Sequence, residues 1–146
     1  MKKEYPVLKF QLLNDEAFAP TRADPGSSGL DVYTPTDLVI NPKCSVLVPL
    51  GIRFEIPFGW DLAVYNKSGI STKKHLIKGA ELIDSSYRGE VHVHLFNLSP
   101  YTETFKRGDK IAQLVMREVW MGYLEETNYI DTNTVRGTGG FGSSGK

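Results

Sequence analysis

The chain has 146 residues, of which 40% are hydrophobic and 23% are charged, and this suffices for one soluble domain with a buried core. Its 17 basic and 17 acidic residues balance, so it lacks the global positive charge typical of proteins that bind duplex nucleic acid non-specifically. The single cysteine, Cys44, excludes an intrachain disulfide framework and a cysteine-based zinc cluster, and no apolar run approaches the roughly 18 residues needed to span a bilayer.

These totals predict a soluble, intracellular protein, located in the cytoplasm of a cell or of an infected host. We expect no membrane partner and no direct binding of nucleic acid. Because the chain contains no internal repeat and no linker, we expect one domain over residues 1–124 and a tail over residues 125–146.

Short apolar segments separated by turn residues follow one another along the chain. The best helical candidate is a short piece near Ile70 to His75, because no longer window keeps a 3.6-residue pattern. Many short strands at a spacing of roughly 8–12 residues indicate an all-β sandwich, barrel or jelly roll. The strands expected from this pattern cover residues 7–13, 30–33, 37–41, 45–50, 52–56, 60–65, 91–96, 103–105 and 110–119.

The stretch from Gly79 to Asn97 is the centre of the chain's candidate chemistry. An apolar pair is followed directly by Asp84, which we expect on a short polar loop, and then by Tyr87 and Arg88. A carboxylate beside a ring and a cation can handle a water molecule and a ring-bearing anion, although Asp84 could also simply make a hairpin turn. The strand that follows alternates Val91, Val93 and Leu95 on one face with His92, His94 and Phe96 on the other.

The tail ends in RGTGGFGSSGK from Arg136, with five glycines in eleven residues. Such a segment is predicted to be mobile in isolation, because ordering about ten residues costs on the order of 10–20 kcal/mol of backbone entropy. A ligand with many contacts could offset that cost; the alternative is a flexible terminus. Arg136 can fork onto phosphate, and Phe141 can stack on a base.

Five stretches together resemble the motifs of the trimeric dUTPases, in that family's order. They are SSGLDVY (27–33), NKSGIS (66–71), GAELIDSSYRGE (79–90), RGDKIAQLV (107–115) and RGTGGFGSSG (136–145). The resemblance implies a jelly-roll-like, distorted β-barrel and a homotrimer with shared active sites, in which residues 125–146 form an arm and a Gly-rich lid over a neighbouring subunit's site. It also implies Mg²⁺-dependent hydrolysis of dUTP to dUMP and pyrophosphate by attack of water at the α-phosphorus, which keeps uracil out of DNA and supplies dUMP for thymidylate synthesis.

The resemblance also implies which residues handle water and metal. Asp84 matches the carboxylate that orients the attacking water and meets the sugar 3′-hydroxyl, and a base at such a site is worth roughly 10²–10⁴-fold. Asp31 matches the acid that helps to place Mg²⁺. Because Mg²⁺ keeps several waters and binds substrate phosphates, one aspartate is sufficient.

The implied substrate contacts come from the second to the fifth motif. Tyr87 matches the ring that packs on the deoxyribose and leaves no room for a 2′-hydroxyl; its alternative role is that of a core aromatic. Backbone hydrogen bonds from the hairpin around Gly79 to Ile83 are implied to select uracil. The remaining implied contacts are Lys67, Ser68, Gly69 and Gln113 at the phosphates, Arg136, Ser143 and Ser144 at the γ-phosphate, and Phe141 with Gly142 over the uracil.

Three residues depart from the family pattern. Lys67 stands where arginine is usual, and lysine is a point charge where arginine forks onto phosphate. Glu81 stands where glycine is usual, and this weakens the expectation for uracil recognition. Ser86 replaces a second aspartate but leaves Asp84 in place.

Three other functions stay open at this point. A cupin-like metal site could use Glu90, His92 and His94, with His75 as the distant ligand. A dCTP deaminase would share the fold but needs a different constellation at the base. A nucleotide-sensing or partner-binding protein could keep the fold without its turnover.

Overall fold

The computed structural model describes residues 5–140, which form twelve strands and one short helix. The chain is nearly all-β, as its pattern of short apolar segments predicts. The elements are β1 (Lys9–Leu12), β2 (Thr21–Arg22), β3 (Leu30–Tyr33), β4 (Leu38–Ile40), β5 (Ser45–Pro49), β6 (Ile52–Glu55), β7 (Trp60–Tyr65), α1 (Ser68–Lys73), β8 (Leu76–Lys78), β9 (Leu82–Ile83), β10 (His92–Asn97), β11 (Glu103–Phe105) and β12 (Lys110–Glu118).

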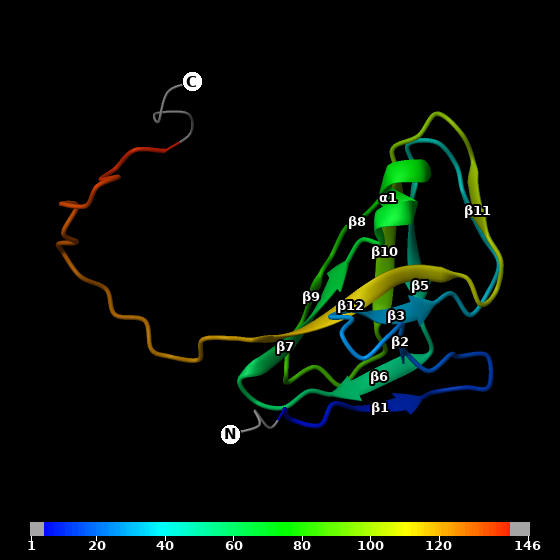
Figure 1. Cartoon of the computed structure of the whole chain (residues 1–146), viewed down its shortest axis with the longest axis horizontal. Coiled ribbons are helices and arrows are strands. Elements are labelled where there is room, and N and C mark those ends of the chain that lie inside the picture. Colours follow the sequence, from blue (N-terminus) through cyan, green and yellow to red (C-terminus); the bar gives the residue numbers. More distant parts are fainter. Residues whose placement is uncertain (1–4, 141–146) are drawn as a thin grey trace.

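The strands pair antiparallel in four sheets that wrap into a jelly-roll-like, distorted β-barrel (Figure 1). The largest sheet has the order β2-β3-β12-β7-β9, and a second has the order β5-β10-β8. The pairs β1-β6 and β11-β4 complete the barrel. In the largest sheet β12 lies between β3 and β7, so segments far apart in the sequence become direct neighbours.

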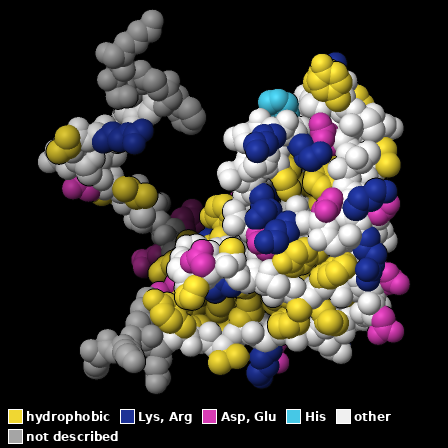
Figure 2. Space-filling view, turned by 45° about the vertical axis from the view of Figure 1, so that its right-hand side comes forward, with side chains coloured by type: hydrophobic (Ala, Val, Ile, Leu, Met, Phe, Trp, Pro, Cys, Tyr) yellow, Lys and Arg dark blue, Asp and Glu magenta, His cyan; other side chains and the backbone are white. Residues whose placement is uncertain are grey.

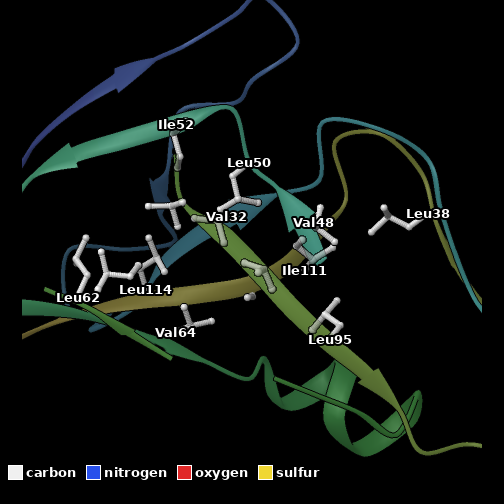
Figure 3. Packing of buried hydrophobic residues seen from close by; sticks show 14 of the residues in the cluster. Val32, Leu38, Val48, Leu50, Ile52, Leu62, Val64, Leu95, Ile111 and Leu114 are labelled. Atoms are coloured by element: carbon white, nitrogen blue, oxygen red, sulfur yellow. The ribbon is translucent and has the colours of Figure 1, made fainter. Parts of the chain in front are cut away.

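The barrel interior is filled by aliphatic side chains from most of the strands, which point toward one another in Figure 3. Burying each Leu, Ile or Val side chain contributes about 1.5–3 kcal/mol, and this is the main force that closes the barrel. The predicted alternation of β10 is confirmed, because its odd-numbered apolar residues are buried and its even-numbered residues face outward. Fully buried members of the core include Ile40, Leu50, Ile52, Leu62, Leu76, Leu95, Ile111 and Leu114.

The helix lies about two residues earlier than predicted. It begins at Ser68, directly after the extended residue Lys67, and its last turn closes with a bond from the Lys74 N–H to the Ile70 carbonyl. His75 has a φ of 53°, a left-handed conformation that ends the helix. The strands β2 and β8 were not predicted, because two or three residues are too few to show a period.

The described chain beyond β12 leaves the barrel as an extended arm (Figure 1). Residues 119–140 contain no strand or helix. Their hydrophobic side chains are exposed, with Tyr123 at 99% and Leu124 at 93%, and hydrophobic side chains are visible along the arm in Figure 2. The single helix within residues 5–140 is neither long enough nor apolar enough to cross a membrane.

Candidate active site

A buried carboxylate held between two lysines forms the first part of the site. Asp31 on β3 is 4% exposed. Its Oδ1 lies 2.5 Å from the Nζ of Lys67, and its Oδ2 lies 2.7 Å from the Nζ of Lys110. One carboxylate between two ammonium groups leaves one net positive charge, so this cluster attracts anions.

The two lysines also determine the protonation of Asp31. Burial by itself raises the pKa of this carboxyl group, but the hydrogen bonds and charges of Lys110 and Lys67 outweigh it and hold the pKa below the usual aspartate range. In return, the hydrogen bond to Asp31 raises the pKa of Lys110. Both shifts favour the ionised forms of Asp31 and Lys110.

Gln113 lies directly beside this cluster, because β12 pairs it with Asp31 of β3 on one side and with Tyr65 of β7 on the other. Its Nε2 donates to the Asn66 carbonyl at 2.9 Å, which holds the amide at the end of β7. Gly29 explains part of the first motif, since a Cβ there would lie 2.2 Å from Oε1 of Gln113. Glycine at this position therefore leaves room for the Gln113 side chain.

The start of α1 borders the same cluster through Lys67, the residue that caps it. The Ser68 carbonyl accepts hydrogen bonds from the hydroxyls of Ser71, at 3.2 Å, and Thr72, at 2.7 Å. An added Cβ on Gly69 would meet nothing within 4 Å. The space where a side chain would stand on Gly69 is therefore open, and its contact with phosphate stays a prediction.

The second part of the site is a hollow of about 190 Å³ that Asp84, Tyr87, Glu90 and His92 line together with three apolar neighbours, Leu82, Ile83 and Val91. Asp84 is exposed and follows β9 directly. The Tyr87 N–H donates to the Asp84 carbonyl at 3.0 Å, and the Tyr87 hydroxyl donates to the Glu90 carbonyl at 2.8 Å. These bonds fix a tight turn that presents a carboxylate and a ring on the same surface.

One subunit does not bring the two parts together. Ile83 pairs with Leu62 on β7, whereas Asp31 and Gln113 align with Tyr65. Asp84 and Asp31 are thus separated in two directions. Along β7 the separation is four residues, roughly 13 Å, and across the sheet it is three strand spacings, roughly 14 Å. The two parts lie on the order of 15–20 Å apart.

A family model of the dUTPases matches residues 15–145. The chain belongs to the dUTPase family. It is therefore an enzyme, and the relatives below are named deoxyuridine 5′-triphosphate nucleotidohydrolase. The protein of Corynebacterium jeikeium is 40% identical over 143 residues, covering 94% of this chain and 92% of the relative. The mouse protein is 39% identical over 139 residues, covering 95% of this chain and 85% of the relative.

The human mitochondrial relative is 39% identical, and this chain spans 55% of its length.

Solved dUTPase structures share the fold. The Staphylococcus bacteriophage 80alpha dUTPase with dUPNHPP has a TM-score of 0.86 at 24% identity, covering 97% of this chain and all of that one. A mutant dUTPase of phage phi11 of S. aureus, described with a structural Mg(II) ion, has a TM-score of 0.80 at 23% identity, covering 85% of this chain and 98% of that one.

The dUTPase hairpin that carries the third motif accommodates Glu81 by local pairing. The Glu81 carboxylate forms an ion pair with Lys78, three residues earlier, and its carbonyl accepts the Val64 N–H at 2.8 Å. Gly79 is needed at its position, because a Cβ there would lie 2.4 Å from Nδ1 of His94. The added charge is thus neutralised at the side chain, while the backbone keeps its place in the sheet.

The hydrogen-bond pattern of β10 leaves a gap opposite His92. The Asn97 N–H bonds to Cys44 beside β5, while the His94 carbonyl accepts from Gly79 on the side of β8. Because these directions alternate along an antiparallel strand, the backbone N–H and carbonyl of His92 also face the side of β8. The strand β8 has already ended at Lys78, so these two groups face the space between β10 and the hairpin.

No group of three or more His, Cys, Asp or Glu side chains within residues 5–140 could hold a metal ion. The His92 Nδ1 instead contacts the Glu90 carbonyl at 3.0 Å, and the His94 ring packs on Phe96 at 4.3 Å between centroids. The cupin-like alternative therefore lacks its ligand set in the described chain. Each oxygen of Asp31 already pairs with a lysine, so this carboxylate would contact Mg²⁺ only through water, while phosphates and water supply the direct ligands.

The last predicted residues lie on the arm or beyond it. Arg136 is exposed, and its Nε donates to the Gly139 carbonyl at 2.8 Å. The arm that carries it extends away from the barrel (Figure 1). The predicted contacts Phe141, Gly142, Ser143 and Ser144 lie outside the described residues.

Sequence reasoning missed Lys110 and Asn66 as members of the site, and it considered Glu90 and His92 only as metal ligands. Lys110 lies inside the fourth motif but pairs with Asp31 only through the strand register. Only the motif boundaries could have drawn attention to it, because no spacing along the chain links it to residue 31.

Proposed function

We propose that this enzyme hydrolyses dUTP to dUMP and pyrophosphate. Water attacks the α-phosphorus, its oxygen forms the new P–O bond, and the bond from the α-phosphorus to the bridging oxygen breaks, so that pyrophosphate leaves. Asp84 orients the water and accepts its proton. The observation that carries this proposal is the exposed Asp84 carboxylate, held beside Tyr87 in a hollow large enough for a sugar.

The phosphates bind at the cationic cluster in this proposal. Lys67 and Lys110 supply charge, Gln113 supplies an amide, and Ser68 with Gly69 supplies a hydroxyl and a backbone N–H. The net positive charge around Asp31 supports this assignment. Mg²⁺ bound to the phosphates would neutralise part of their charge, and Asp31 would hold it through water.

Sugar and base bind at the third-motif hairpin. Tyr87 packs on the deoxyribose, and the backbone from Gly79 to Ile83 meets one edge of the uracil. The outward-facing N–H and carbonyl of His92 lie across the gap from that segment, so a planar base with alternating donors and acceptors can be held between them. A fixed backbone edge of this kind discriminates strongly against a base with the wrong pattern.

The separation of the two parts supports a homotrimer with shared sites. Because Asp84 lies far from the phosphate cluster of its own chain, a neighbouring copy would supply the other half. The exposed apolar side chains of the arm support the same assembly, since Tyr123 and Leu124 are 99% and 93% exposed in the single chain. Residues 125–146 then form a lid over a neighbour's site, with Arg136, Phe141, Gly142, Ser143 and Ser144 on the γ-phosphate and the base.

Pyrophosphate release from dUTP, dCTP, dTTP and UTP, each with and without Mg²⁺, tests the proposal. We expect rapid, Mg²⁺-dependent release from dUTP alone. Release from several nucleotides would keep the hydrolase but contradict the proposed base pocket. Ammonia release from dCTP would instead indicate a deaminase. Tight binding of dUTP without any turnover would indicate a sensing protein. We would then replace Lys67, Glu81 and Ser86 by the arginine, glycine and aspartate that are usual in the family.

A further inference from the structure

One backbone carbonyl receives two side-chain donors at the floor of the Asp84 hollow. The Glu90 carbonyl accepts from the Tyr87 hydroxyl at 2.8 Å and contacts Nδ1 of His92 at 3.0 Å. Because a carbonyl can only accept, the His92 nitrogen carries its hydrogen there. The same bond exists in the neutral Nδ1–H tautomer and in the imidazolium, so it does not depend on the charge of the ring.

The carbonyl itself is fixed to the barrel. The Glu90 side chain accepts the Gly51 N–H at 2.7 Å. The Val91 N–H, which shares the peptide plane of the Glu90 carbonyl, donates to Ile52 at 2.8 Å, and the Leu50 N–H donates to Val91 at 3.0 Å. Any group that bonds to this carbonyl is therefore held at a fixed position relative to the core.

The ring of Tyr87, in contrast, has few restraints. It is 45% exposed. Its hydroxyl end lies against Gly89, where an added Cβ would come within 2.4 Å of the oxygen. A carbonyl has two lone pairs, and His92 uses one of them, so the Tyr87 hydroxyl is restricted to the other.

We propose that His92 is a positioning residue, which fixes the direction of the Tyr87 ring and thereby sets the preference for deoxyribose over ribose. This inference rests on the proposed function, because it assigns Tyr87 to the sugar. The physical step is the choice of lone pair: when His92 no longer donates, the hydroxyl can move to the vacated side and the ring tilts away from the position that excludes a 2′-hydroxyl.

Two substitutions separate the donor from the bulk of the ring. His92→Leu keeps the approximate size of the side chain but is apolar, so it removes the donor. His92→Asn places an amide N–H near the position of Nδ1. His75→Asn is the matched control, because it removes an imidazole at the end of α1, outside the hollow, and asparagine tolerates the left-handed backbone there.

The readout is the ratio of kcat/KM for dUTP over UTP, which a merely destabilised protein would leave unchanged. We expect His92→Leu to lower this ratio about threefold to tenfold, the equivalent of one neutral hydrogen bond. His92→Asn and His75→Asn should stay near the wild-type ratio. Tyr87→Phe should lower the ratio as well, and adding His92→Leu to it should have no further effect.

The inference is overturned if His92→Leu leaves the ratio unchanged while Tyr87→Phe lowers it. Should the wild-type enzyme release no pyrophosphate from dUTP, the proposed function fails, and the inference is then tested by binding. The ratio of dissociation constants for non-hydrolysable dUTP and UTP analogues should fall in His92→Leu by the same factor. Equal binding of both analogues to the wild-type protein would refute it.

Discussion

Replacing Asp31 by asparagine should make the protein less stable and, at the same time, a tighter binder of pyrophosphate. The substitution keeps the shape but removes the charge that two lysines share at 2.5 and 2.7 Å. Breaking a buried pair can cost 3–5 kcal/mol. Since Lys67 and Lys110 are partly exposed, they can turn to water, and we expect a loss of about 1–3 kcal/mol in the free energy of unfolding.

Binding should change in the opposite direction, because the cluster gains one positive charge. An extra unit charge near a phosphate is worth about 1–2 kcal/mol in a partly solvated site, or roughly fivefold to thirtyfold in affinity. Calorimetry with pyrophosphate at low salt and without Mg²⁺ measures this gain, which should shrink at high salt. Asp37→Asn is the control, because Asp37 pairs with Lys106 at 2.7 Å on the exposed surface.

The stability difference should also depend on pH. The pKa of Asp31 is lowered in the folded state, so its contribution is fully present above the usual aspartate value near 3.9 and is lost as pH falls through the lower, folded value. Wild type and Asp31→Asn should therefore differ at neutral pH and converge in acid, as followed by denaturant unfolding. An Asp31→Asn protein that is as stable as wild type at neutral pH, or that binds pyrophosphate more weakly, would refute the reasoning.

Four further results are expected. Asp84→Asn should keep nucleotide affinity but lower kcat at least about a hundredfold; normal turnover would exclude Asp84 as the base. Deleting residues 136–146 should abolish most activity while light scattering still shows a trimer; a fully active truncation would contradict the lid. Mixing these two inactive proteins should restore some activity, because each supplies what the other lacks if sites are shared. Gly79→Ala should lower stability by about 1–3 kcal/mol, since its Cβ would lie 2.4 Å from His94, whereas Gly69→Ala, which meets open space, should unfold like wild type.

The fold could be predicted where one face of a strand is buried and the other is not. Alternation along β10 gave both the strand and its inward face, because burial imposes a period of two. The strand β8 was not predicted, because three residues cannot show a period. The pairing of β3 with β12 was equally out of reach, because local pattern says nothing about which distant strand becomes the neighbour.

The site could be predicted where a motif keeps its residues close in sequence. Asp84 and Tyr87 share one turn, so their closeness follows from the sequence, and in the structure both line one hollow. Lys110 contacts Asp31 only because β12 pairs with β3 in a particular register. The sequence therefore suggested a lone metal-binding aspartate, where the structure shows a carboxylate already shared by two cations.

That sharing also accounts for the lysine at position 67. An arginine there could place two N–H donors on both oxygens of a carboxylate, whereas a lysine offers one point contact. In this chain Lys67 takes one oxygen of Asp31 and Lys110 takes the other, so two lysines together satisfy both carboxylate oxygens. Glu81 follows the same logic, because Lys78 neutralises it within the hairpin. Each of these two departures is thus compensated by a neighbouring lysine within its own half of the site. Among residues 5–140 the exposed Asp84 carboxylate forms no salt bridge, so it is available to water.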